Sequence, residues 1–444
     1  MNLIEKYNAS VPRYTSYPSV PHWNDKPDTT WARFVEENLK RFGHLPVSIY
    51  VHLPYCESLC TFCGCNTRIT VNHNVESPYI EGVLNEWKHI SRLAGAPLNI
   101  ECVHFGGGTP TFFSPTNLLK LANGLLEGHT VSPNASLSFE ANPGSTTKKH
   151  LELLASVGFS RVSFGVQDFD TEVQKTVNRI ETVDKVRQVT DWAREHGYTS
   201  INYDLIYGLP KQTVFTVENT IDQVNLLHPD RIAFYSYAHV PWIKRGQNSY
   251  RQVLPTPDEK IKMLSRAREL FRQAGYEYIG LDHFALPTDT LYRSLLNGTL
   301  QRNFMGYTEV NTPLLIGLGV SAISSSPMGY TQNVKTIEAY LSRVQSGVTG
   351  AYRGHRFGLV DVIFKDIIEN IMCGRAADLT EAVPFLPADA VDRLCEMEND
   401  NLLRFRDNTV EPTTLGRYFL RNICAAIDPA MAGQREENRF SMSV

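Results

Sequence analysis

The chain has 444 residues, of which 42% are hydrophobic and 20% charged, a composition typical of globular proteins with a large core. Its net charge of −4 and pI of about 6.4 argue against a nucleic-acid-binding protein, for which a basic domain is expected. No apolar run approaches the ~20 residues of a membrane span, and the first residues lack the pattern of a signal peptide. We therefore expect a cytoplasmic protein that binds neither membrane nor nucleic acid.

The first 40 residues are rich in Pro, Tyr and Ser, and only TWARFVEENLKRF (30–42) has the periodicity of an amphipathic helix. An alternation of strands and helices follows. Strands are predicted at 48–54, 100–105, 136–141, 161–166, 200–208 and 231–238. Helices are predicted near 78–93, 115–127, 146–157, 183–196 and 214–227. Six such alternations indicate a parallel sheet with right-handed crossovers.

These strands are polar on one face, which is unusual for a sheet covered by helices. Tyr50 and His52 alternate with apolar residues in the first strand, as do Glu140 in the third and Asp204 in the fifth. Unpaired polar groups in a dry core would cost about 1–3 kcal/mol each. A partial barrel with a ligand-filled interior avoids this cost, and its site would open at the C-terminal ends of the strands. The alternative, an antiparallel sheet with one solvated face, is disfavoured by the intervening helices.

The strand pattern fades after about residue 330, and residues 355–430 are expected to be mainly helical, with a small β-hairpin within 401–416. We therefore predict an α/β protein in three parts. Residues 1–40 form an N-terminal extension that packs on the barrel mouth, with Arg13 near a substrate carboxylate. Residues 41–330 form a partial (β/α)6 barrel, and residues 331–444 a mainly helical C-terminal domain.

Four cysteines lie within ten residues, in the pattern Cys56-x3-Cys60-x2-Cys63-Gly-Cys65, directly after the first strand. Thiolates are ligands of zinc and of iron–sulfur clusters. Three thiolate ligands would leave one iron of a four-iron cluster open to a small molecule, whereas four would close it. The spacing alone does not decide between zinc and iron.

In this position the first three cysteines, with Phe62 before the third, form a motif that resembles the radical S-adenosylmethionine signature. More closely, the chain resembles the family of oxygen-independent coproporphyrinogen III oxidases nearly end to end. The similar stretches include PRYTSYP (12–18), YVHLPYC (50–56), HFGGGTPT (104–111), FEANP (139–143), DLIYGLPKQT (204–213), RNF-x-GYT (302–308) and GVSAIS (319–324). The chain departs from the family's pattern at Gln301 and Met305, and these two positions are expected to lie on the side of the site that binds the substrate.

The resemblance implies a fold, the radical S-adenosylmethionine partial barrel, and two cofactors. A 4Fe–4S cluster would be ligated by Cys56, Cys60 and Cys63, while Cys65 would not ligate it. Two molecules of S-adenosylmethionine would bind, and catalytic roles would fall to Tyr50, His52 and Arg179. The implied cofactor-binding residues are Tyr50, Phe62, Gly106, Gly107, Gly108, Thr109, Glu140, Gln167, Arg179, Asp204, Ala238 and Ile323.

The reaction that the resemblance implies belongs to haem biosynthesis. Two propionates of coproporphyrinogen III would be oxidatively decarboxylated to the vinyl groups of protoporphyrinogen IX, through a 5′-deoxyadenosyl radical. A reducing donor such as flavodoxin or ferredoxin would supply electrons, and the protein would act as a monomer. The alternatives are a haem chaperone, another radical enzyme acting on a tetrapyrrole, and a zinc module without activity.

Overall fold

The computed structural model describes residues 3–23, 30–241, 244–432 and 442. Its main feature is a twelve-stranded sheet with seven consecutive parallel strands, six of which form the arc of the barrel. These six strands are β1 (Pro46–Leu53), β4 (Asn99–Gly107), β5 (Thr130–Ala141), β6 (Arg161–Gln167), β7 (Ser200–Tyr207) and β8 (Arg231–Ser236). They match the six predicted strands, and the partial (β/α)6 barrel is confirmed.

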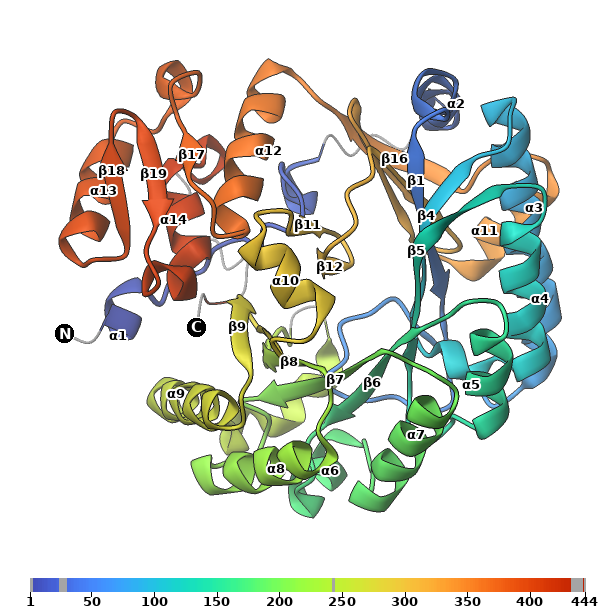
Figure 1. The fold of residues 1–444 in the computed structure, drawn as a ribbon, viewed down its shortest axis with the longest axis horizontal. Helices are drawn as coiled ribbons and strands as arrows, with labels where there is room; N and C mark the ends of the chain where they lie inside the picture. The colour runs from blue at the N-terminus through green and yellow to red at the C-terminus, as the bar shows by residue number, and fades with distance from the viewer. Residues whose placement is uncertain (1–2, 24–29, 242–243, 433–441, 443–444) are drawn as a thin grey trace.

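Helices cover the outer side of this arc of strands (Figure 1). They are α3 (Glu76–Ala94), α4 (Pro115–Leu126), α5 (Lys148–Ala155), α6 (Thr171–Val177), α7 (Val183–Glu195), α8 (Val214–Leu227) and α9 (Pro257–Gln273). Local sequence fixes several of their starts: Ser114 caps α4 ahead of a proline, and Thr256 forms a capping box with Glu259 at α9. The apolar sides of strands and helices form one large core between them.

Antiparallel strands extend the sheet at both edges. Beyond β8 lie β10 (His283–Ala285) and β9 (Glu277–Gly280). On the other side β13 (Leu314–Leu318) pairs parallel with β1, and three antiparallel strands continue from it. These are β14 (Ile323–Ser326), β15 (Gly329–Asn333) and β16 (Ala351–Arg356), with α11 (Ile337–Gln345) between the last two.

The sequence-based expectation that strands end near residue 330 is therefore wrong, because β15 and β16 belong to the same sheet as the barrel strands. Both strands are short and rich in polar residues, so they lack an apolar periodicity that would reveal them. The boundary between a barrel domain of residues 41–330 and a domain of residues 331–444 stays a prediction about folding units.

The C-terminal part is mainly helical, with α12 (Leu359–Met372), α13 (Ala390–Asn399) and α14 (Leu420–Ile427). The predicted hairpin is present as β18 (Leu403–Arg406) and β19 (Thr409–Pro412), and β17 (Ala377–Asp378) adds a third strand.

The N-terminal segment packs into this C-terminal core. It contains α1 (Leu3–Tyr7), and the predicted amphipathic helix is α2 (Thr30–Phe42). Tyr7, Tyr14 and Tyr17 belong to the buried cluster formed by the C-terminal helices. Arg13 forms an ion pair with Asp282 and lies 5.8 Å from the ring centre of Tyr235. Residues 24–29 of the predicted extension lie outside the described residues, and packing of the whole extension on the barrel mouth stays a prediction.

A separate two-stranded hairpin lies between the main sheet and the C-terminal helices (Figure 1). Its strands are β11 (Gln301–Asn303) and β12 (Gly306–Thr308), and α10 (Thr290–Leu296) precedes it. None of the helices within the described ranges combines the length and apolar character that crossing a membrane requires.

Candidate active site

The cysteine loop leaves the C-terminal end of β1 and is fixed at both of its ends. Its first part, β2 (Tyr55–Cys56), pairs with β3 (Arg68–Ile69). Farther along, Asn178 donates a hydrogen bond to the carbonyl oxygen of Leu59 at 2.8 Å, and the Thr61 amide donates to Val177 at 3.1 Å. The loop is therefore held against the segment that follows α6, at the end of the barrel where a site was predicted.

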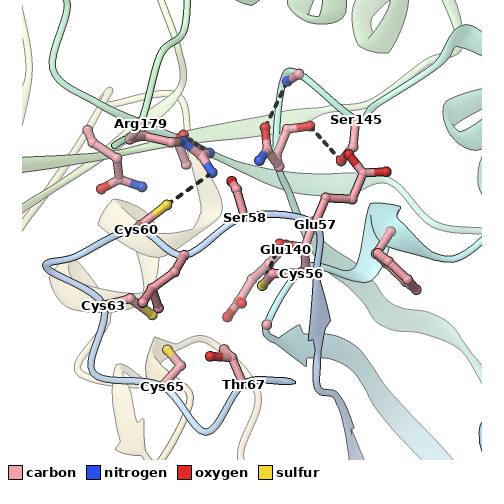
Figure 2. Close-up of a pocket in the computed structure, with 18 of the residues that line it drawn as sticks. Cys56, Glu57, Ser58, Cys60, Cys63, Cys65, Thr67, Glu140, Ser145 and Arg179 are labelled. Atoms are coloured by element: carbon pink, nitrogen blue, oxygen red, sulfur yellow. Dashed lines mark hydrogen bonds between the residues drawn. The ribbon is translucent and has the colours of Figure 1, made fainter. Parts of the chain in front are cut away.

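A cavity of about 580 Å³ opens at this end of the strands. Figure 2 shows the cysteine side chains on one side of it, with Glu140 and Arg179 nearby. Eleven of the predicted residues line it: Cys56, Cys60, Phe62, Cys63, Gly107, Gly108, Thr109, Glu140, Gln167, Arg179 and Asp204. Residues from five different strands or the loops after them thus meet at one place.

The partly buried thiols of the cysteine loop need nearby positive charge in order to ionise. Burial raises the pKa of Cys56 to about 11 and also raises the pKa of Cys60. Such thiols ionise when a nearby cation stabilises the thiolate. Arg179 supplies one positive group, with Nη1 3.9 Å from Sγ of Cys60, and a cluster would supply the rest. Within the described part of the chain no three His, Cys, Asp or Glu side chains converge on a single ion, and thiolates that each bind a different iron need no such convergence.

The run of three glycines at the end of β4 is explained by close packing. Gly107 has a φ of +122°, and a Cβ there would lie 2.9 Å from Nδ1 of His52. A Cβ on Gly106 would lie 2.9 Å from Oε1 of Glu140, and one on Gly108 would lie 2.8 Å from the carbonyl oxygen of Pro54. The Gly107 amide donates to Oε2 of Glu140 at 3.2 Å. The glycines therefore let the backbone form one wall of the cavity.

A second cavity, of about 550 Å³, adjoins the first and shares Glu140 and Cys65 with it. Tyr50, His52 and Ile323 line this second cavity. The hydroxyl of Tyr50 lies 3.1 Å from Nδ1 of His52, and burial lowers the pKa of His52, so that its ring is neutral. The predicted residues are thus divided between two adjoining cavities, with Glu140 facing both.

Two predicted residues, Gly106 and Ala238, are outside both sets of lining residues, and Tyr235 and Phe304 were missed. Ala238 is exposed, just after β8, and is outside the two sets of lining residues. Tyr235 lines the first cavity but was not predicted. It lies two positions after Ala233 on the polar face of β8, so the alternation used for the other strands could have found it. Met305, which the resemblance placed on the substrate side, lines the second cavity from the hairpin tip. Phe304 lines it as well, which no pattern in the barrel strands indicates.

Asp204 is held by hydrogen bonds from Ser163 at 3.0 Å and Asn202 at 2.9 Å. Burial, reinforced by the charge of Glu140, raises its pKa from 3.8 to about 7. The folded protein therefore keeps a proton that the unfolded chain loses near pH 4. The resulting penalty on folding is absent below about pH 4, grows up to about pH 7 and is constant above it.

We expect Asp204→Asn, tested without S-adenosylmethionine, to be more stable than the wild type by about 2–4 kcal/mol at pH 8 and equally stable at pH 4. Unfolding experiments at the two pH values measure this difference. Asp222→Asn on the exposed side of α8 is the control and should change neither value. An Asp204→Asn variant that is less stable at pH 8 would show that the carboxylate is charged and satisfied in the fold.

Comparisons with known proteins agree with this geometry. The Radical SAM superfamily model matches residues 50–224, from β1 to α8. Curated relatives named oxygen-independent coproporphyrinogen III oxidase match the chain along its length. The protein from Synechocystis is 35% identical, with 100% of this chain and 97% of the relative covered. The protein from Pseudomonas aeruginosa is 37% identical, with 98% and 97% covered. This chain belongs to the oxygen-independent coproporphyrinogen III oxidase family.

A solved structure of the same family supports the membership at the level of the fold. The structure described as "Coproporphyrinogen III oxidase (HemN) from Escherichia coli is a Radical SAM enzyme" is 34% identical and has a TM-score of 0.87. It covers 94% of this chain and 99% of the solved chain. Radical SAM membership implies a 4Fe–4S cluster and S-adenosylmethionine, so iron is favoured over zinc at the cysteine loop of this coproporphyrinogen oxidase family member.

Proposed function

We propose that this chain catalyses the oxygen-independent oxidative decarboxylation of coproporphyrinogen III to protoporphyrinogen IX in haem biosynthesis. Each of two propionates gives a β-hydrogen atom to the 5′-deoxyadenosyl radical, forming 5′-deoxyadenosine, then loses CO2, passes one electron to an external one-electron acceptor and becomes a vinyl group. The observation that carries the proposal is the family match over nearly the whole chain, combined with a cavity in which the three signature cysteines face Glu140, Arg179 and Asp204.

The proposed roles follow from the chemistry of each side chain. When bound, the cluster and S-adenosylmethionine supply the carbon radical that removes the hydrogen atom. Cys56, Cys60 and Cys63 would each bind one iron. The Glu140 carboxylate, which faces both cavities, would accept hydrogen bonds from ribose hydroxyls of one S-adenosylmethionine.

Residues on β6, on β7 and in the loop after α6 would hold a second S-adenosylmethionine. Arg179 is anchored by a hydrogen bond from Nη2 to the Gly165 carbonyl at 2.6 Å, which aims its guanidinium along the cavity wall. Such a fixed cation suits a carboxylate. Gln167 and Asp204, which line the first cavity, would contact the same molecule. Ala238 would reach it from outside the lining residues, just after β8. Equilibrium dialysis with S-adenosylmethionine measures the number of bound molecules directly, and two per chain is the expected result.

Tyr50, His52 and Ile323 would form the side of the second cavity where the adenosyl group lies. The neutral His52 ring is held by the Asn66 carbonyl oxygen, 2.8 Å from Nε2. This contact and the one to Tyr50 hold both ring nitrogens in place. Tyr50 and His52 would therefore form a rigid, uncharged wall of the cavity. Phe62 would close the apolar side of the cysteine loop.

The deciding experiment is an anaerobic assay of the reconstituted protein with coproporphyrinogen III, S-adenosylmethionine and dithionite. We expect protoporphyrinogen IX and 5′-deoxyadenosine to form, and both to disappear in air, because an open iron is accessible to oxidants. Binding of haem without decarboxylation would favour a haem chaperone instead. Full turnover in air without a reductant would exclude the radical mechanism.

We further propose a cytoplasmic monomer that receives electrons from a flavodoxin or ferredoxin. Reduced cysteines, without a disulfide among those described, are in keeping with a reducing compartment. Sedimentation of the loaded protein tests the monomer, and replacing dithionite by each donor protein tests the source of electrons.

A further inference from the structure

The Glu309 carboxylate joins the β11–β12 hairpin to the end of the barrel where its strands begin, while Tyr307 fixes the hairpin on its other side by donating a hydrogen bond to the Met372 carbonyl at 2.6 Å. Glu309 follows β12 directly and forms an ion pair with Arg161, the first residue of β6. Its Oε1 atom also lies 3.5 Å from Nη2 of Arg231, the first residue of β8. Thr290, at the start of α10, donates a hydrogen bond to the same oxygen at 3.2 Å. The hairpin is thus attached where the barrel strands begin.

Glu309 belongs to a largely buried network of ion pairs and hydrogen bonds. The side chains of Arg161 and Glu309 are about one-fifth exposed, while those of Arg231 and Asp289 are almost fully buried. Arg231 also pairs with Asp289 at 2.8 Å, and Ser200 donates to Asp289 at 2.8 Å. Burial opposes the charge of Glu309, but the two arginines outweigh it and hold its pKa down, at about 2. The pairing is therefore intact across the physiological pH range.

The other end of the hairpin reaches the second cavity of the candidate active site, which we call the reaction chamber. Phe304 and Met305 form its tip, and both line the second cavity beside Tyr50 and Glu140. Phe304 also lines a neighbouring cavity of about 340 Å³, and Met305 a small one inside the barrel. The hairpin pairs only with itself, through Gln301–Thr308 to Asn303–Gly306. Its position depends on side-chain anchors rather than on the main sheet.

We infer that Glu309 is a positioning residue: by fixing the hairpin to the barrel floor, it sets how far Phe304 and Met305 enter the chamber and how the tetrapyrrole lies against the cofactor. This inference rests on the proposed function. It assigns no contact between Glu309 and the substrate. The anchor and the tip lie at opposite ends of the hairpin. Loss of the anchor should therefore misalign the substrate without removing a group that takes part in the reaction.

Glu309→Gln keeps the shape of the side chain and removes its charge. We expect amide hydrogen exchange in residues 301–308 to accelerate at least tenfold, with iron content unchanged. We also expect KM for coproporphyrinogen III to rise about fivefold, and the ratio of 5′-deoxyadenosine to vinyl product to rise at least threefold. When the substrate is misaligned, S-adenosylmethionine is cleaved without formation of a vinyl group. The ratio of 5′-deoxyadenosine to vinyl product is a readout that a purely structural role would not change.

Two further variants make the test decisive. Glu218→Gln breaks a comparable ion pair, Glu218–Arg266 at 2.5 Å between the outer helices, and should leave exchange in 301–308 and the product ratio unchanged. Thr290→Val removes the hydrogen bond that Thr290 donates to Glu309 and the one that it accepts from Nη2 of Arg231 at 3.1 Å, but it leaves the ion pairs of Glu309 in place. It should shift both readouts in the same direction by a smaller factor. It replaces Glu309→Gln as the test if that variant does not fold.

Unchanged exchange in 301–308, or an unchanged product ratio, in whichever variant folds would overturn the inference. Accelerated exchange in a protein whose wild type does not convert coproporphyrinogen III would leave the anchor in place and refute the proposed substrate. The two failures are therefore distinguishable, because hydrogen exchange is measured without substrate.

Discussion

Replacing Cys56, Cys60 or Cys63 by Ala should remove the iron–sulfur cluster and abolish formation of vinyl product, a loss of at least 10³-fold. Each replacement leaves one iron corner without its only protein ligand. Iron analysis, the absorbance near 400 nm and anaerobic product assays measure the effect. The cysteines line the cavity, so their removal opens no void in the apolar core, and the variants should remain folded.

Cys65→Ala is the matched control, since this cysteine lies in the same loop and is exposed. We expect it to keep most of the iron. Equal loss of iron from the Cys65 and Cys56 variants would contradict a three-ligand cluster and would require a different arrangement of ligands.

The largest expected effect on stability concerns the junction of the two chain ends. Tyr14 and Tyr17 donate hydrogen bonds to the two oxygens of Asp428, at 3.0 and 3.1 Å, and all three side chains are buried. Replacing both tyrosines by Phe leaves Asp428 with the Ala430 amide, which donates at 2.8 Å. Hydrogen bonds to a charged group contribute about 1.5–3 kcal/mol each, so we expect a loss of about 3–5 kcal/mol.

Hydrogen exchange of the α14 amides measures this loss as a lower free energy of local opening. Tyr292→Phe on α10 is the control and should change stability by less than about 0.5 kcal/mol. If the double variant is as stable as the wild type, the N-terminal segment does not contribute to the C-terminal core. A flexible N-terminal tail, the simplest alternative to a packed extension, predicts that outcome.

Much of the barrel could be predicted because its determinants are local. The alternation of polar and apolar residues in each strand identified the interior face, and with it Tyr50, His52, Glu140 and Asp204. The starts of α4 and α9 are likewise determined locally, by the N-caps Ser114 and Thr256, each followed by a proline. The family motif then assigned cofactors that residue patterns alone left undecided between zinc and iron.

The rest depends on contacts between distant segments. β13 adds to β1 across more than 260 residues, and β15 and β16 carry too many polar residues to stand out as strands. Nothing in PRYTSYP indicates that Tyr14 meets Asp428, 414 residues away. Likewise, Glu309 has no neighbouring pattern that would connect it with Arg161 and Arg231. Such pairings arise from the tertiary fold and have no signature in the local sequence.

The burial of Tyr14 and Tyr17 against Asp428 has a consequence for biosynthesis. A ribosome adds ~5–20 residues per second, so the two tyrosines wait roughly 20–80 s for a partner that is translated 414 and 411 residues later. During that interval the strands of the barrel and the cysteine loop have already emerged. The C-terminal core can form only after the last helix is released, whereas the residues that line the two cavities of the candidate active site all precede residue 336. The order of translation therefore makes all residues of the candidate active site available before the N-terminal segment finds its partner in the C-terminal core.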